Sequence, residues 1–82
     1  KEKMTFIENL GPDNIAYMIR DNGYTYLIVH NLGERLLKVK TSINESIELI
    51  WSNAFKNEKV DEIAVGDYTS NIYKIKGEIY EL

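Results

Sequence analysis

The sequence contains no cysteine and only one histidine, His30, in 82 residues. The missing cysteine excludes disulfides, thiolate metal sites and thiol nucleophiles, and it fits a reducing compartment. A single histidine cannot form a metal site alone, and as a general base it would need a nucleophile within hydrogen-bond reach. Asp61, Glu62 and Asp67 lack the alternating ligand pattern and central glycine of a calcium loop. We therefore expect no catalytic residue, no metal site and no cofactor, as in a protein that is not an enzyme.

Long apolar runs are also missing. No stretch is long enough to span a bilayer, and no signal-peptide pattern is present, so we expect no membrane contact and a cytoplasmic location. Gly33, Gly66 and Gly77 are isolated and make no phosphate-binding loop. The length predicts a single domain over residues 1–82 with a modest core.

Basic residues are fewer than acidic residues, ten against thirteen, which gives a net charge of −3. Residues 42–82 hold eight of the acidic and only four of the basic residues. This balance argues against direct binding of nucleic acid, which normally requires a basic surface. It fits docking onto a basic partner surface, although an acidic surface also keeps small proteins soluble.

The stretch Thr41–Asn57 has the pattern of a long amphipathic helix. Ser42 and Glu45 have the spacing of a capping box. The apolar residues behind them recur at helical intervals: Ile43, Ile47, Ile50, Trp51, Ala54 and Phe55. We expect this face to be buried against a sheet.

Asn22-Gly23 predicts a tight hairpin between Ile15–Asp21 and Tyr24–Asn31, because both turn residues accept a positive φ. The turn sets the register. It places Tyr17 opposite Ile28 on one face and Met18 opposite Leu27 on the other.

A second hairpin at Leu32-Gly33 would add Glu34–Lys40 to the same sheet. One face then collects the residues expected under the helix: Ile15, Tyr17, Ile19, Tyr26, Ile28, Leu37 and Val39. The opposite face collects Ala16, Met18, Leu27, Val29 and Leu36. A one-residue slip of the second hairpin would exchange these sets for the third strand.

The two ends of the chain complete the expected sheet. Met4–Leu10 fits a strand, with a helix as the alternative, and a turn follows at Gly11–Asn14. Val60, Ile63 and Val65 indicate a short strand, and Ile72–Leu82 indicates another with a bulge at Gly77. The predicted fold is α+β: an antiparallel meander with one helix on one face, in ββββαββ or αβββαββ order.

Two surfaces are candidates for partner binding. The first is acidic and tyrosine-bearing, since tyrosine is enriched at interfaces. Its residues are Asp61, Glu62, Asp67, Tyr68 and Tyr80. The second is the sheet face left open by a single helix, where exposed apolar residues would mark an interface or a homodimer contact. Its residues are Met18, Leu27, Val29 and Leu36.

Residues 25–57 resemble a small phage-encoded anti-CRISPR protein that inhibits the type II RNA-guided nuclease. The matching features are a strand with Leu27 and Ile28, a turn with Asn31 and Gly33, and the segments Asn44-Glu45-Ser46-Ile47 and Ala54-Phe55-Lys56-Asn57. That family acts through acidic residues that imitate DNA. Here the acidic run after the helix is reduced to Glu58, Asp61, Glu62 and Asp67, and Leu32 replaces an acidic residue.

The resemblance implies a small phage or prophage protein that blocks a host protein. Nucleic-acid-binding proteins and defence proteins are the candidate partners. Our leading hypothesis is accordingly a non-enzymatic inhibitor that acts by protein–protein contact. The alternative is a homo-oligomeric structural or assembly module, and a small enzyme using His30 is the third possibility.

Overall fold

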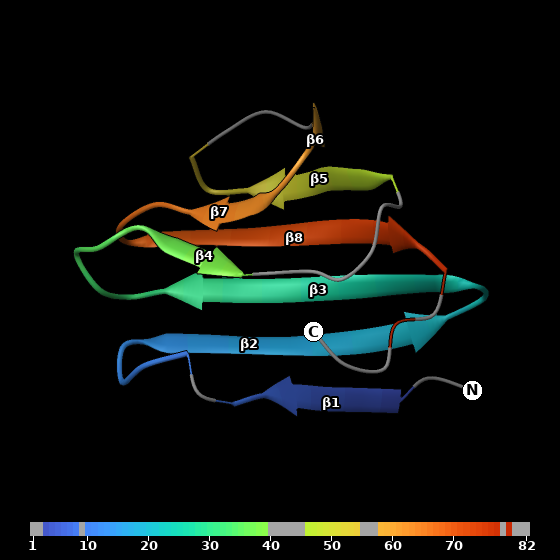
Figure 1. Cartoon of the computed structure of the whole chain (residues 1–82), viewed down its shortest axis with the longest axis horizontal. Coiled ribbons are helices and arrows are strands. Elements are labelled where there is room, and N and C mark those ends of the chain that lie inside the picture. Colours follow the sequence, from blue (N-terminus) through green and yellow to red (C-terminus); the bar gives the residue numbers. More distant parts are fainter. Residues whose placement is uncertain (1–2, 9, 40–45, 55–57, 78, 80–82) are drawn as a thin grey trace.

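The computed structural model describes residues 3–8, 10–39, 46–54, 58–77 and 79, and within these ranges it contains eight strands and no helix. The strands are β1 (Lys3–Ile7), β2 (Asn14–Asp21), β3 (Tyr24–Asn31), β4 (Leu37–Val39), β5 (Ile47–Ser52), β6 (Glu58–Val60), β7 (Ile63–Val65) and β8 (Thr69–Lys76). Six of them form one antiparallel sheet in the order β1-β2-β3-β8-β5-β6, and β4 pairs with β7 in a small second sheet (Figure 1). The fold is all-β, so the predicted α+β class with an amphipathic helix is wrong.

The first part of the large sheet follows the expected local chemistry. Asn22 and Gly23 have φ values of 51° and 80°, as the predicted tight turn requires. The register between β2 and β3 pairs Tyr17 with Ile28 and Met18 with Leu27, which confirms the prediction. Residues 3–7 form a strand, β1, so the helical alternative for this segment is excluded.

The predicted helix over Thr41–Asn57 is a strand where the structure describes it. Ile47 and Leu49 alternate with the exposed Glu48, which is the period of a strand, and both are buried between the sheets. A bulge between Leu49 and Trp51 then shifts the phase and turns Trp51 to the opposite face. The capping box and Phe55 lie outside the described residues.

The predicted second hairpin is also wrong. β4 pairs with β7 through Leu37 and Val65, whereas the free edge of β3 is taken by β8. The β3–β8 ladder runs from Tyr24 opposite Lys76 to Asn31 opposite Thr69, and the longer ladder satisfies far more backbone groups than the three-residue β4 could. Leu37 and Val39 therefore do not extend the face that holds Ile28.

Ile63 and Val65 lie in β7 as expected, but Val60, expected in the same strand, belongs to β6. The C-terminal strand differs from the prediction at its end. Gly77 has a φ of 96° and terminates β8 instead of forming a bulge within it. Its amide donates to the Gly23 carbonyl at 2.8 Å, so the end of β8 is held against the β2–β3 turn.

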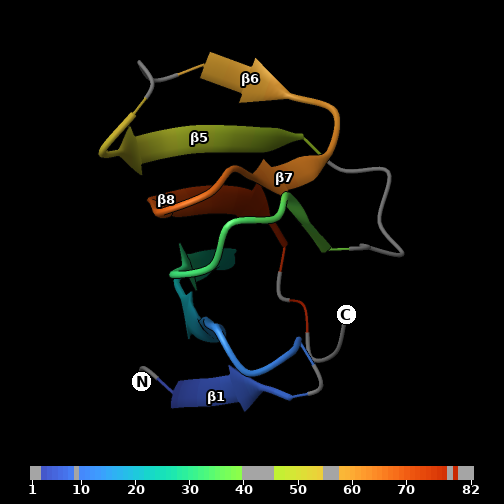
Figure 2. The same ribbon diagram turned by 90° about the vertical axis from the view of Figure 1, so that its left-hand side faces the viewer.

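The core lies between the large sheet and the small one. Both small strands lie on the same side of the large sheet (Figure 2). Met18, Leu27 and Val29 are at most 2% exposed on the large sheet's inner face, and they pack in one cluster with Ile63 and Val65 of β7. This is the face that we predicted to be open. The face predicted to lie under the helix is the outer face, which no described element covers.

Two buried polar residues on the inner face, Asn31 and Thr25, form hydrogen bonds with backbone groups. The Nδ2 group of the Asn31 side chain donates to the backbone carbonyls of Arg35, Val65 and Gly66, at 2.7, 3.0 and 3.0 Å. The Thr25 hydroxyl donates to the Gly77 carbonyl at 2.9 Å and accepts from the Ile79 amide at 2.7 Å. These contacts fasten the loops and the segment after β8 onto the large sheet.

Candidate functional site

A continuous apolar row crosses the outer face of the large sheet. The backbone register places one residue from each of five neighbouring strands opposite the next: Phe6, Tyr17, Ile28, Ile72 and Trp51. We call these five residues the outer row. At the usual spacing between strands the row is about 19 Å long.

The two ends of the outer row are the most exposed. Phe6 is 61% and Trp51 is 48% exposed, whereas Ile28 at the centre is only 8% exposed. The ring centroids of Phe6 and Tyr17 lie 5.7 Å apart in a tilted arrangement, which is a favourable aromatic contact. Met4 and Ile15, which are 56% and 47% exposed, extend the apolar area beside the row.

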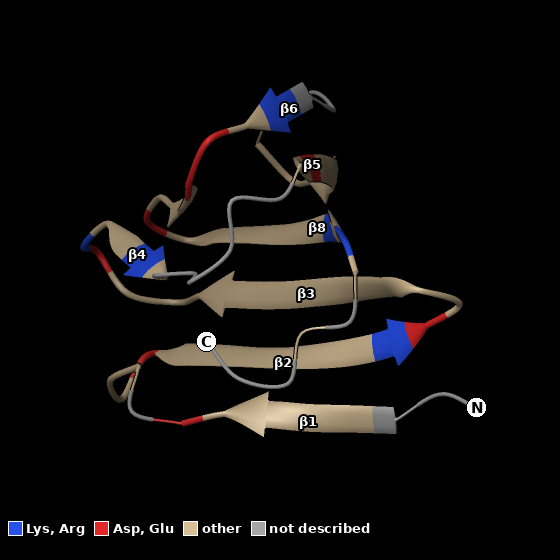
Figure 3. Cartoon of the chain, turned by 45° about the vertical axis from the view of Figure 1, so that its right-hand side comes forward, with Lys and Arg blue, Asp and Glu red and all other residues tan. Residues whose placement is uncertain are grey.

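Charged residues lie toward one edge of the same face. A second row pairs Tyr26 with Lys74, Lys74 with Glu48, and Glu48 with Lys59. The Lys74 amine also lies 4.2 Å from the ring centroid of Tyr24. Figure 3 shows no charged residue on β3 and, on β2, charged residues only at its end.

His30 has a hydroxyl partner on this face. Its Nδ1 lies 2.7 Å from Ser70 Oγ, and the Tyr17 ring centroid lies 6.5 Å from its own. A hydrolase built on such a pair would also need free N–H donors for the oxyanion. Both strands are interior to the sheet, with neighbours on each side, so the nearby backbone N–H groups are used in the ladders.

The structure separates the residues predicted to bind a partner. Asp61, Glu62, Asp67 and Tyr68 are exposed, and Asp61 and Glu62 lie together in the turn between β6 and β7, away from Asp67 and Tyr68 in the turn before β8. Tyr80 lies outside the described residues. Within the described ranges, no group of three or more His, Cys, Asp or Glu side chains is placed to hold a metal ion.

The predicted apolar surface is not a surface. Met18, Leu27 and Val29 are core residues, and only Leu36, at 59%, is exposed. Sequence reasoning missed Phe6 and Trp51 as surface residues. The exposed face could have been recognised from the tyrosine and histidine residues at alternate positions of β2 and β3, because such side chains keep a polar tip in water.

No protein-family model and no curated protein matches the chain. Solved structures do match it. An isomaltulose synthase mutant of Erwinia rhapontici NX5 in complex with sucrose is similar over 92% of this chain and 14% of its own, at a TM-score of 0.69 and 20% identity. A MutB double mutant in complex with isomaltulose is similar over the same shares, at a TM-score of 0.67 and 23% identity.

Identity at this level shows the fold alone. The chain spans about one seventh of the length of the structures it matches. The helix on which the anti-CRISPR resemblance depended is a strand at Ile47–Ser52. The phage, inhibitor and anti-defence roles that this resemblance implied find no support in the fold or in these structures. The described part of the chain has no helix with the length and apolarity needed to cross a membrane.

Proposed function

We propose that this chain is a non-catalytic binding domain that docks onto a larger protein through its outer row. The observation that carries the proposal is the unbroken apolar line from Phe6 to Trp51 on a face that no described element covers. Exposed apolar area of this extent usually marks an interface, and aromatic residues dominate the energy of such interfaces.

The surroundings of the row match the usual anatomy of an interface. Lys74, Glu48 and Lys59 provide a polar rim at one end, and His30 with Ser70 provides polar groups beside the centre. The row is built on paired strands, so its side chains are held in place before binding, and little conformational entropy is lost on docking.

The similar structures favour a protein partner. In each of them the region with this fold is 14% of an enzyme chain, so a unit of this kind occurs as part of a much larger protein. We infer that the partner presents an apolar surface that accepts the aromatic ends of the row. The cytoplasmic location expected from the sequence belongs to the same proposal.

The contact between His30 and Ser70 supports the non-catalytic part of the proposal, because each side chain has the other as its hydrogen-bond partner. The pair holds β3 and β8 together on the outer face, which is a structural use of both side chains.

Photo-crosslinking tests the docking face. A benzoylphenylalanine placed at Phe6 or at Trp51 should crosslink to one and the same larger protein in cells that produce the chain. The same group at Lys38, an exposed residue on the small sheet, serves as the control and should give no such product.

Two outcomes contradict the proposal. Equal crosslinking from the Lys38 position would show that the outer row is not selective. Crosslinking of the chain mainly to its own copies would instead establish the homo-oligomeric module that the sequence left as the alternative.

A further inference from the structure

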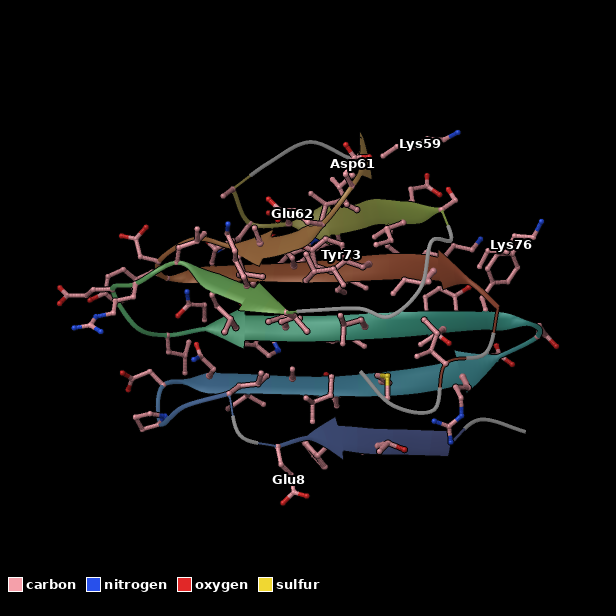
Figure 4. The ribbon with its side chains drawn as sticks, viewed as in Figure 1. Glu8, Lys59, Asp61, Glu62, Tyr73 and Lys76 are labelled. Carbon is pink, nitrogen blue, oxygen red and sulfur yellow. The ribbon has the colours of Figure 1, made fainter. Side chains whose placement is uncertain are left out.

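The two edge strands of the large sheet differ in how they are protected. Among the described residues, β1 pairs only with β2 at one edge, and β6 pairs only with β5 at the other. A free edge presents unpaired N–H and C=O groups to other chains, so proteins commonly shorten or charge their edge strands. β6 has only three residues, and Figure 4 shows the exposed Lys59 side chain pointing away from the sheet. The β6 edge is therefore protected against further pairing.

β1 has none of these protections. It is five residues long, contains no proline, and pairs with β2 in a continuous register without a bulge. Its middle residues Met4, Thr5 and Phe6 are uncharged, and Glu8 lies beyond the end of the strand (Figure 4). The Met4 and Phe6 side chains are 56% and 61% exposed on the outer face. β1 is therefore an uncharged, apolar edge that is open to an added strand.

The register of the β2–β3 hairpin shows which backbone groups of β1 are free. In a two-residue hairpin the residues that flank the turn form a hydrogen-bonded pair, and so does every second pair along the ladder. Tyr17 and Ile19 therefore direct their N–H and C=O groups toward β3. Met4 and Phe6 lie opposite Ile19 and Tyr17. Their own N–H and C=O groups consequently point away from β2, to the side on which no described strand lies.

We propose that the partner of the outer row adds an extended strand to β1. The proposal rests on the docking proposed above, and it names the element of the partner that makes the contact. Met4 and Phe6 offer two backbone donors and two acceptors to such a strand. Phe6 is also the β1 end of the outer row. A strand added about 4.8 Å beyond β1 would place a side chain beside Phe6, so the row would continue into the partner.

The geometry also specifies the chemistry of the added strand. The residues that lie beside Met4 and Phe6 must carry apolar side chains, whereas the backbone pairing leaves the rest of the sequence free to vary. A second copy of β1 is a poorer occupant. Two exposed apolar side chains from each copy, at roughly 100 Å² apiece, would bury about 400 Å², far below the roughly 1,200 Å² of a stable interface. A partner that also covers the outer row has no such shortage.

Titration with a short strand tests the site directly. The probe is the peptide acetyl-Lys-Val-Thr-Val-Thr-Val-Glu-amide, which carries its valines on one face. It should shift the amide signals of Met4 and Phe6 and slow their hydrogen exchange, with a millimolar dissociation constant, and it should leave the amides of β6 unchanged. The same peptide N-methylated at its three valines lacks the donors that face β1 when the valines lie beside Phe6. It should therefore bind at least about tenfold more weakly.

A matched pair of variants tests the backbone of β1. Met4→Pro removes an outward-facing N–H at an edge, where proline is tolerated, and it should weaken peptide binding at least about tenfold. Met4→Leu keeps that N–H and an apolar side chain of similar volume, so it should change binding less than about threefold. Slow exchange at the Thr5 amide, which faces β2, checks that β1 stays paired in both variants. The N-methylated peptide tests the same hydrogen bonds without altering the protein.

Three results would overturn the proposal. They are unchanged amides at Met4 and Phe6, equal shifts on β6, and equal binding of the N-methylated peptide. Shifts at Met4 and Phe6 that follow the concentration of the chain itself, without peptide, would assign the edge to a second copy instead. The crosslinking experiment fails separately. Loss of crosslinks from Phe6 and Trp51 would remove the proposed docking, whereas failure of the peptide alone would limit that docking to the side chains of the row.

Discussion

Truncation of Leu27 to alanine tests which face of the large sheet is the core. Leu27 is 0% exposed and lies between Met18 of β2 and Tyr73 of β8 in the backbone register. Leucine-to-alanine changes at such positions cost about 2–5 kcal/mol, because the neighbouring strands cannot close the cavity. A domain of this size has a free energy of unfolding of about 4–12 kcal/mol. At about 4–8 °C for each kcal/mol, a loss of about 3 kcal/mol should lower Tm by about 12–24 °C.

Ile15 provides the matched control. Its side chain has the same number of carbon atoms as that of Leu27, but it lies on the outer face and is 47% exposed. At about 0.8 kcal/mol for each fully buried methylene group, Ile15→Ala should cost only about 1 kcal/mol. Each variant removes three carbon atoms, so the difference in burial is the main difference between them.

Urea denaturation followed by far-UV circular dichroism measures both losses. We expect a lower midpoint at an unchanged m value, and a difference of at least about 1.5 kcal/mol between the variants. If the inner face of the sheet is the covered one, Leu27→Ala must lower the free energy of unfolding more than Ile15→Ala does. Had a helix covered the other face, Ile15→Ala would be the costlier change, so that order of the two losses would refute the fold described above.

Three further changes test individual contacts. Burial raises the pKa of Tyr73, against a smaller opposing effect of its hydrogen bond from Asn71, so the native state keeps a proton that the unfolded chain loses near its ordinary pKa. This stabilisation is complete below about pH 10 and is lost as the pH rises through the raised pKa, so the unfolding free energy should fall less steeply above pH 10 in Tyr73→Phe. Thr25→Val should cost about 2 kcal/mol or more and speed hydrogen exchange at the Ile79 amide, since it leaves that buried amide and the part-buried Gly77 carbonyl without their partner. Unchanged exchange would contradict this prediction. Gly23→Ala should cost about 1–2 kcal/mol in a thermal melt because φ is +80°, whereas Gly66→Ala, outside the left-handed region, should stay within about 0.5 kcal/mol.

The β2–β3 hairpin could be predicted from the sequence because its determinants are local. Asn22 and Gly23 select the turn, and the turn alone sets every pair along both strands. Strand β7 is similar, since Ile63 and Val65 alternate with a partly exposed Ala64.

Residues 46–54 could not be assigned in the same way because their pattern fits two periods. Ile47 and Ile50 are spaced as on a helix, yet Ile47, Glu48 and Leu49 alternate as in a strand. The choice is made by pairing with Ile75 and Tyr73 of β8, more than twenty residues away, and no local signal reports that contact. The order β3-β8-β5 depends on the same distant strand, so the predicted β3–β4 hairpin failed for the same reason.

The prediction of which sheet face is open was wrong because β2 and β3 are apolar on both faces. Alternation separates Met18 and Leu27 from Tyr17 and Ile28, but it does not say which pair is covered. The polar residues between them carry that information. Thr25 and Asn31 can be buried because their short side chains reach backbone groups, whereas the tyrosine and histidine side chains of the other face do best with their polar tips in water.

The same asymmetry leaves the outer face without a described element over it. The small sheet offers only two strands of three residues, which can cover one side of a six-stranded sheet and not both. On a sheet face exposed to water, the outward-facing residues are normally charged or small and polar, as Ser70, Lys74 and Lys76 are on β8. The middle of β1, β2 and β3 differs, and it keeps Phe6, Tyr17 and Ile28 in line instead. Folding alone gives no reason to keep an exposed phenylalanine at the end of that row, and this is why we propose that the row docks onto a protein surface.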